Sequence, residues 1–337
     1  MLVWAHRWGT DPGRGAEGSM SVTLPAPARD LTTECFSHEA LFYRGARELV
    51  DSVAPFVREG VSIGEPVLVA LLPDRIDALH DELGEDARWV TFLDMEDVGR
   101  NPARIIPAWR EFVGASSGHA HVRGVGEPIW AGRRDAELAE CQLHESLLNV
   151  AFDDGPAWRL LCPYDTESLS DSVVREAMRT HPVVWTGGNG RTVDYGGHAY
   201  ASAAFAGPLS PSPDSADLIE FGANDLTGLR SVVERLGLSA GIGRDAVDDV
   251  TLAAHELATN SLVHGGGHGS MLVWRQPDAF VVEVRDAGRI NDPLVGRELS
   301  SATNEHGRGL WMANQLCDLV QVRSTDFGTV VRLYVWG

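Results

Sequence analysis

The sequence predicts two domains, an α/β domain with a parallel sheet followed by an α+β domain. The chain has 337 residues, and a single hydrophobic core usually stops growing near ~250–300 residues. Short apolar runs alternate with helical patterns up to about residue 185, whereas two helical patterns precede paired strands after residue 222. This change of pattern coincides with a Gly-, Pro- and Ser-rich segment, so we expect one domain on either side of it.

Composition sets the predicted boundaries. Residues 1–33 are rich in Gly, Pro, Ala and Thr without a sustained period, which indicates a disordered leader. Residues 34–185 are the first domain, residues 186–221 a Gly/Pro-rich linker, and residues 222–337 the second domain.

In the first domain, helical and strand patterns alternate. Apolar residues from Leu41 to Phe56 recur at helical spacing, which predicts a helix over 39–59. The run PVLVALL at 66–72 is continuously apolar and is typical of a buried parallel strand. The alternation predicts βαβ units, with later helices over 74–83, 102–115, 133–152 and 170–180 and strands over 88–93, 120–125 and 159–162.

The second domain has a different order. Its patterns predict an α+β sandwich, because helices come first and a run of strands follows. The predicted helices are 225–237, 245–264 and 309–318, and the predicted strands are 270–275, 280–285, 320–324 and 329–335, with an irregular stretch over 287–305.

Charge and composition exclude several classes of function. The 48 acidic and 28 basic residues give a net charge of −20, which argues against direct nucleic-acid binding through a basic surface. The sequence contains no lysine, which excludes a P-loop, a eukaryotic-type protein kinase and a Schiff-base enzyme. The chain shows no signal peptide, no apolar run of ~18–20 residues and no dense cysteine framework. We therefore expect a cytoplasmic protein without membrane attachment.

The segment HELATNSLVHG, residues 255–265, carries the first chemical signal. Glu256 and Asn260 are four residues apart on a predicted helix, so they share one face. A carboxylate beside a carboxamide fits a Mg²⁺-nucleotide site, because Mg²⁺ prefers oxygen ligands. Taken alone, the pair is more typical of a solvated polar helix face.

Two further segments follow in order. In VEVRDAG, residues 282–288, Asp286 ends a strand and can accept a hydrogen bond from an exocyclic amine, while Gly288 lets a flat ring approach the backbone. In HGRGLWMANQL, residues 306–316, Gly307 and Gly309 precede a helix whose free N–H groups can face a phosphate. An ordinary turn and an ordinary helix start remain the alternatives for each segment alone, but the ordered set favours a nucleotide site.

These three segments resemble the boxes of the GHKL ATPase superfamily. Within that superfamily, residues 222–337 are most similar to the bacterial anti-sigma factors that act as serine/threonine kinases. The resemblance implies ATP and Mg²⁺ as cofactors, Glu256 as the general base and Asn260 as the Mg²⁺ ligand. It also implies that Asp286 binds the adenine amino group.

The same resemblance assigns the remaining positions of the site. Gly288 would line the adenine pocket, residues 289–306 would form the ATP lid, and the phosphates would be enclosed by Gly307, Gly309 and Leu310. One position departs from the family pattern, since Ile290 replaces the second glycine of the first glycine box. That departure affects the lid geometry and leaves open whether kinase activity is retained.

The first domain also carries family motifs. They are GRNPARIIPAW (99–109), RGVGEPIWAGR (123–133), ECQLHESLLNVAF (140–152) and LCPYD (161–165). Together they resemble the MEDS sensory domain over about residues 36–183. The resemblance implies an α/β fold related to RecA-like ATPases without the P-loop, consistent with the absence of lysine.

A sensory site is a hypothesis for this domain. Cys141 and His144 lie three apart on a predicted helix, Cys162 ends a strand and His38 is near the domain start. Such a set could ligate a soft or borderline metal. The competing interpretation, which the absence of a CxxC pair favours, is that the cysteines are small buried hydrophobes and the histidines hydrogen-bonded structural residues.

Two candidate ion pairs also lie within the MEDS-like motifs. They join Glu127 to Arg123 and Glu140 to Arg133.

Three functional hypotheses follow. The first is a signal-responsive anti-sigma regulator that binds MgATP and phosphorylates an anti-anti-sigma (STAS-type) partner on Ser or Thr, sequesters a sigma factor, or does both. The second is a non-catalytic ATP-dependent binding module. The third is a sensor histidine kinase without a recognisable phosphoacceptor domain, which the missing helical hairpin before residue 222 opposes. The oligomeric state stays open, with a homodimer among the alternatives.

Overall fold

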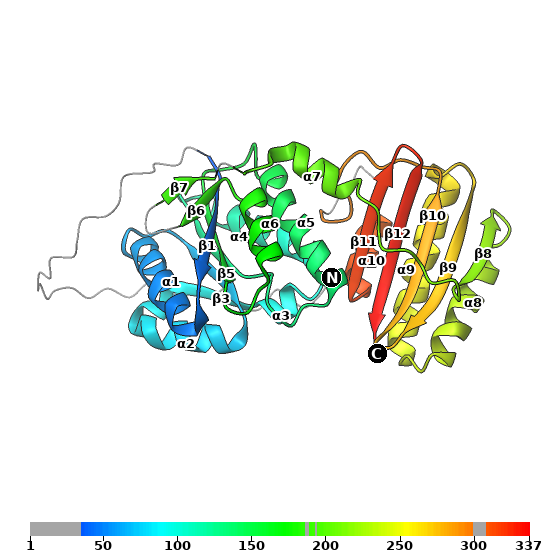
Figure 1. Cartoon of the computed structure of the whole chain (residues 1–337), viewed down its shortest axis with the longest axis horizontal. Coiled ribbons are helices and arrows are strands. Elements are labelled where there is room, and N and C mark those ends of the chain that lie inside the picture. Colours follow the sequence, from blue (N-terminus) through cyan, green and yellow to red (C-terminus); the bar gives the residue numbers. More distant parts are fainter. Residues whose placement is uncertain (1–34, 186–188, 193, 299–307) are drawn as a thin grey trace, which may run out of the picture. The chain divides into compact units, whose positions relative to one another are not determined.

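The structure is a computed structural model that describes residues 35–185, 189–192, 194–298 and 308–337. The predicted leader and Gly307 lie outside the described residues, as does the second half of the predicted lid. Residues Thr33–Gly337 form one unit by their contacts, and this unit contains both predicted sheets (Figure 1).

The first sheet is parallel except at one edge. Its strand order is β3-β2-β4-β5-β1-β6-β7, and only β7 runs antiparallel to its neighbour. This confirms the predicted α/β class. The strands are β1 Ser37–Tyr43, β2 Val67–Leu71, β3 Val90–Asp94, β4 Arg123–Gly126, β5 Arg159–Asp165, β6 Val183–Trp185 and β7 Asn189–Arg191.

Helices cover both faces of this sheet (Figure 1). Leu41 and Tyr43 of β1 point into a core shared with α1 and α2, whereas Ala40 of β1 and Cys162 of β5 point into a core shared with α4, α5 and α6. Burial on both faces explains why β2 is continuously apolar. The helices are α1 Gly45–Ser62, α2 Pro73–Leu83, α3 Met95–Val98, α4 Ile105–Ala115, α5 Asp135–Ala151, α6 Asp171–Thr180 and α7 Gly197–Phe205, with short 3₁₀ helices at Gly84–Trp89 and Pro102–Arg104.

The predicted helix over 39–59 was wrong in its first six residues. The chain forms β1 up to Tyr43, turns at Gly45 with φ of +71°, and then begins α1. A central strand buried on both faces is a short apolar run, and periodicity alone does not separate such a run from a helix. The correction matters because β1 carries His38.

The second sheet is antiparallel, in the order β11-β12-β10-β9-β8. The helices α8, α9 and α10 lie on one of its faces (Figure 1), and Val250, Ala254 and Leu257 of α9 join the same core as Val282 of β10. The predicted α+β class is confirmed. The elements are β8 Asp217–Gly222, α8 Leu226–Ser239, α9 Arg244–His264, β9 His268–Gln276, β10 Ala279–Asp286, α10 Arg308–Leu316, β11 Leu319–Thr325 and β12 Gly328–Trp336.

None of the helices in the described part of the chain is both long enough and apolar enough to cross a membrane.

Candidate functional site

The core of the second domain fixes the face of α9 that carries Glu256 and Asn260. Ala254, Leu257 and Ala258 of this helix are buried against the sheet. Glu256 and Asn260 are half-buried, one helical turn apart. The carboxylate and the carboxamide therefore lie on the same side of α9, as their spacing predicted.

The beginning of α10 lies against this pair. A Cβ atom placed on Gly309 would be 2.9 Å from Nδ2 of Asn260 and 3.6 Å from Oε2 of Glu256. The next residue, Leu310, is buried in the core. Because glycine has no Cβ atom, the backbone at Gly309 can come close to both polar side chains. The first turn of α10 therefore lies next to Asn260 and Glu256.

Asp286 lies at the end of β10, beside the C-terminal part of α9. Its Oδ2 accepts a 2.6 Å hydrogen bond from the hydroxyl of Ser261, and its Oδ1 accepts a 2.7 Å bond from the backbone N–H of Gly288. An ionised carboxylate can accept further hydrogen bonds at both oxygens. The two internal donors thus fix the orientation of Asp286 and leave it able to accept from a ligand amine.

Gly288 is closely enclosed. A Cβ atom at this position would lie 2.7 Å from the carbonyl oxygen of His264 and 3.0 Å from Cα of Gly265. On the other side, the carbonyl of Gly288 accepts a 2.9 Å bond from Oγ1 of Thr329. The turn after β10 is therefore held between the end of α9 and the start of β12.

Ile290, the departure from the glycine-box pattern, has a structural role. Its backbone N–H donates a 2.8 Å hydrogen bond to Oγ of Ser324 on β11, and its side chain packs partly buried against the core. The first residues of the predicted lid are thereby attached to the sheet. Arg297, further along this segment, is buried as well.

These residues fit a Mg²⁺-nucleotide. Asn260 would offer an oxygen to Mg²⁺ and Asp286 an acceptor to an exocyclic amine, and the glycines at 288 and 309 leave room that a side chain would fill. The helix beginning at Arg308 places its N-terminal end next to Asn260. Of the predicted nucleotide residues, only Gly307 lies outside the described residues.

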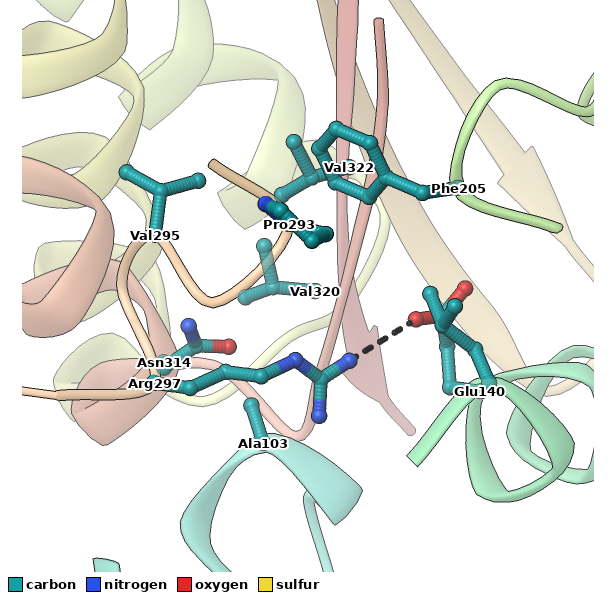
Figure 2. Close-up of a pocket in the computed structure, with 10 residues that line it drawn as sticks. Ala103, Glu140, Phe205, Pro293, Val295, Arg297, Asn314, Val320 and Val322 are labelled. Atoms are coloured by element: carbon teal, nitrogen blue, oxygen red, sulfur yellow. Dashed lines mark hydrogen bonds and ion pairs between the residues drawn. The ribbon is translucent and has the colours of Figure 1, made fainter. Parts of the chain in front are cut away.

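A cavity of the unit is lined from both sequence halves (Figure 2). Its wall contains Glu140 of α5, which pairs with Arg297 through Nη2 at 3.5 Å and with Arg323 of β11 at 2.6 Å. The other lining residues are Ala103, Leu143, Phe205, Pro293, Val295, Asn314, Val320 and Val322.

Both ion pairs predicted from the sequence were wrong. Glu140 pairs with the two arginines of the second half instead of Arg133, whose guanidinium donates to the carbonyls of Pro128 and Gly99. Arg123 pairs with Glu59 and Glu65, and Glu127 contacts Arg75 and the hydroxyl of Tyr43.

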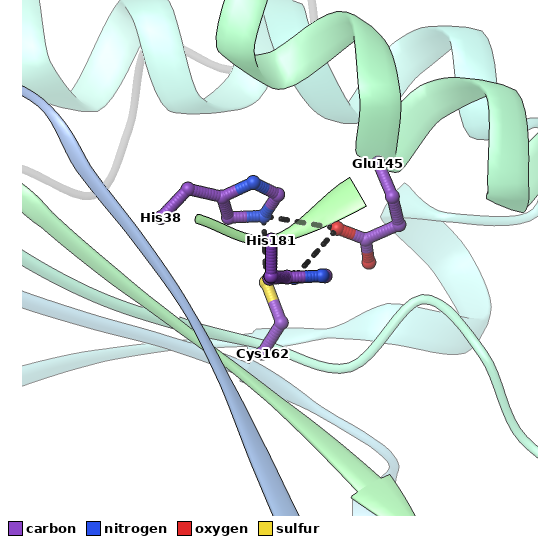
Figure 3. Close-up of side chains that lie close together, drawn as sticks. All are labelled: His38, Glu145, Cys162 and His181. Carbon is purple, nitrogen blue, oxygen red and sulfur yellow. Dashed lines mark hydrogen bonds and ion pairs between the residues drawn. The ribbon is translucent and has the colours of Figure 1, made fainter. Parts of the chain in front are cut away.

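In the first domain, the structure brings together two of the four predicted sensory residues. His38 and Cys162 lie 3.4 Å apart, from Nε2 to Sγ, next to Glu145 and His181 (Figure 3). The four potential ligand atoms lie within 4.8 Å of one another, and all four residues are buried.

Cys141 and His144 are not part of that cluster. Sγ of Cys141 donates to the carbonyl of Pro128 at 3.3 Å, and His144 is a fully buried ring beside it on α5. Burial raises the pKa of the Cys141 thiol to about 12 and lowers that of His144 to about 3, so both are uncharged at neutral pH. Cys141 and His144 therefore fit the competing interpretation, in which the cysteines are small buried hydrophobes and the histidines are structural residues of the core.

Sequence reasoning missed Glu145, His181 and Ser261. α5 is buried around most of its circumference, so its sequence does not show which of its polar residues share a site. His181 follows α6 immediately before β6 and has no motif around it. Ser261 had an available signal, because it follows Asn260 and a short hydroxyl side chain there can reach a neighbouring carboxylate.

Comparisons with known families agree with this geometry. No curated protein matches the chain. Residues 37–182 match the family model described as MEDS, MEthanogen/methylotroph, DcmR Sensory domain, and residues 220–335 match the model described as Histidine kinase-like ATPase domain. The chain thus combines a MEDS domain with a histidine-kinase-like ATPase domain.

Proposed function

We propose that the protein is a signal-responsive anti-sigma regulator. In this proposal, its C-terminal domain binds MgATP and phosphorylates an anti-anti-sigma (STAS-type) partner on Ser or Thr, sequesters a sigma factor, or does both. The observation that carries the proposal is the position of Gly309 against both Asn260 and Glu256. An amide that would hold Mg²⁺ and a carboxylate that would act as a base thereby lie beside the same helix N-terminus.

Phosphoryl transfer needs little covalent chemistry from the protein. It needs a positioned nucleotide, charge stabilisation and a group that orients or deprotonates the attacking hydroxyl. Asp286 would hold the adenine, and the backbone N–H groups at the start of α10 would face the phosphates. Mg²⁺, held through Asn260, would neutralise phosphate charge. Glu256 would accept the proton of the partner's serine or threonine.

Sensory control has a physical route in the contacts of α5. This helix carries Glu145 of the buried His/Cys cluster and Glu140. Glu140 pairs with Arg297, which belongs to the predicted lid, and with Arg323 of the ATPase sheet. A change in the position of α5 would therefore act on the segment next to the phosphates.

Two alternatives make different predictions. A non-catalytic module would bind ATP or its partner, and this binding would not depend on Glu256. A sensor histidine kinase would need a phosphoacceptor histidine, usually on a dimerising hairpin. In the described residues before α8, the chain forms β7, α7 and β8. Among those residues we see no such hairpin, which favours transfer to a separate protein.

The test is transfer of radiolabelled phosphate. The full chain is incubated with labelled MgATP and, one at a time, with the STAS-type proteins and sigma factors of the same genome. We expect one STAS-type protein to acquire acid-stable, base-labile phosphate on Ser or Thr. Acid-labile phosphate on the chain itself would support the histidine kinase instead. Binding of a partner without any transfer would support the non-catalytic module.

A matched pair of variants controls this test. Glu256→Gln removes the base and should abolish most transfer, whereas Glu234→Gln changes an exposed glutamate that pairs with Arg244 on the surface and should leave transfer intact. Equal loss in both variants would indicate a general folding defect.

A further inference from the structure

Four side chains of different elements converge in the buried core of the first domain (Figure 3). His38 comes from β1, Glu145 from α5, Cys162 from β5 and His181 from the segment between α6 and β6. The Nε2 atom of His38 is 3.0 Å from Oε2 of Glu145. None of the four is more than 1 % exposed.

The backbone determines which nitrogen of His181 carries a proton. Its Nδ1 lies 2.8 Å from the carbonyl oxygen of Ala177, which can only accept a hydrogen bond. Nδ1 must therefore donate, and in the neutral ring Nε2 carries the lone pair. That lone pair lies 3.4 Å from Oε2 of Glu145, and Nε2 has no hydrogen-bond partner among the described residues.

The same reasoning applies to His38 through Asn149. The amide Nδ2 of Asn149 donates to the carbonyl of Thr180 at 2.8 Å, which fixes the amide orientation. Its Oδ1 then faces Nδ1 of His38 at 3.3 Å and must accept from it. The neutral ring of His38 therefore also presents a lone pair from Nε2.

Two imidazole nitrogens, a carboxylate oxygen and the sulfur of Cys162 thus point at one another. Two imidazole lone pairs and a carboxylate oxygen repel each other in a buried site, where water cannot screen them. We propose that His38, Glu145, Cys162 and His181 bind one divalent first-row transition-metal ion, with zinc as the expected occupant.

The geometry and the donor set suit zinc. Atoms bound tetrahedrally at the ~2.0–2.3 Å usual for Zn²⁺ ligands lie about 3.3–3.8 Å apart. Three of the separations are 3.0, 3.4 and 3.4 Å and all four atoms lie within 4.8 Å of one another, so shifts of about an ångström or less match this geometry. Two imidazoles, a thiolate and a carboxylate are borderline ligands. Asn149 and the carbonyl of Ala177 supply the outer hydrogen bonds that hold metal-bound histidines in one tautomer.

The experiment uses the full chain, purified without chelators and analysed for metals. We expect about one zinc ion per chain and, after removal of zinc, uptake of Co²⁺ with visible bands of a tetrahedral site and a thiolate charge-transfer band. Metal removal should lower the melting temperature, and Zn²⁺ should restore it, because an ion that binds only the folded state stabilises it. These readouts need no variant.

The chain supplies its own matched controls. His181→Gln and Cys162→Ser should lose the metal and the Co²⁺ bands, with the thiolate band absent in Cys162→Ser. His144→Gln and Cys141→Ser remove a buried histidine and a buried cysteine outside the cluster and should retain both. The proposal is overturned if the wild-type chain neither contains zinc nor takes up Zn²⁺ or Co²⁺. A proton shared between Glu145 and a histidine would then explain the cluster. The proposal is also contradicted if His144→Gln and Cys141→Ser lose metal uptake as completely as His181→Gln and Cys162→Ser do.

Discussion

The hydroxyl of Ser261 donates a 2.6 Å hydrogen bond to Oδ2 of Asp286, joining α9 to the end of β10. This bond orients the carboxylate assigned to the adenine amino group. It also connects the helix that carries Glu256 and Asn260 to the turn that carries Gly288. Hydrogen bonds through Asp286 therefore join α9 to the turn that carries Gly288.

The first prediction concerns adenine recognition. Asp286→Asn should weaken MgATP binding by roughly 1.5–3 kcal/mol, the range for a hydrogen bond to a charged group. Ser261→Ala should weaken it less, because the carboxylate stays but loses one orienting donor. Titration calorimetry measures both, with Asp217→Asn, an exposed carboxylate at the start of β8, as the control. Equal wild-type affinity for ATP and GTP would refute the adenine assignment.

The second prediction concerns the start of α10. Gly309→Ala should fold but bind MgATP more weakly, because the added Cβ would lie 2.9 Å from Nδ2 of Asn260 and must displace that side chain. Gly228→Ala in α8 is the control, since nothing lies within 4 Å of the added atom. The control should keep its affinity and be slightly more stable, by up to ~1 kcal/mol, from helix propensity. Unchanged ATP affinity in Gly309→Ala would place the nucleotide elsewhere.

The third prediction concerns Glu140. This residue is 1 % exposed, and it pairs with the buried guanidinium groups of Arg297 and Arg323. Glu140→Gln should lower the free energy of unfolding by about 3–5 kcal/mol, because it leaves buried positive charges without a counter-charge. Urea denaturation measures the loss.

The control for Glu140 is Glu111→Gln, which changes an exposed glutamate of α4 and should have little effect. If Glu140 transmits a signal to the predicted lid, its variant should also change the ATP affinity at temperatures where it remains folded. If Glu140→Gln were as stable as the wild type and bound ATP with the same affinity, the contacts of Glu140 would neither stabilise the fold nor transmit a signal to the predicted lid.

The fourth prediction concerns pH. Burial raises the pKa of Glu127 to about 7, although Arg75 and the Tyr43 hydroxyl favour its charged form. In the unfolded chain this carboxyl titrates near ~4.3. Between about pH 4.3 and 7 the folded state therefore binds more protons, and its stability should fall as the pH rises. The loss from this group is on the order of 3 kcal/mol at 1.36 kcal/mol per pKa unit.

Glu127→Gln provides the comparison, because an amide does not titrate in this range. As the pH rises from 4.5 to 7.5, the free energy of unfolding of the wild type should fall relative to that of Glu127→Gln. Urea denaturation at several pH values measures it. Parallel stability curves would mean that Glu127 titrates at its ordinary value.

The sequence was sufficient to predict both fold classes and the position of Glu256 and Asn260 on one face of a helix. Helical spacing is a local property, so two residues four apart share a face whatever surrounds the helix. The continuous apolar run of β2 and the helix-then-strand order of the second domain are equally local. Spacing did not identify β1, because Leu41 and Phe42 also fit the helical period that continues into α1.

The composition of the His/Cys cluster and the partners of Glu140 depend on long-range packing. His38 and His181 are 143 positions apart by their numbers in the chain, and parallel strands place them together. Likewise, Glu140 meets Arg297 and Arg323 only when α5 packs near the ATPase sheet. The predicted partners were nearer in the sequence but wrong, and no spacing rule covers such distances.

The central claim is that Glu256 serves as the base of a protein kinase. Its most direct test is the single-turnover rate of phosphate transfer from MgATP to the identified partner, measured for wild type, Glu256→Gln and Glu234→Gln at saturating ATP. We predict that Glu256→Gln binds MgATP like the wild type but transfers phosphate ~10²–10⁴-fold more slowly, the usual contribution of a general base. Glu234→Gln should match the wild type. An unchanged transfer rate in Glu256→Gln, with ATP binding intact, would contradict the claim.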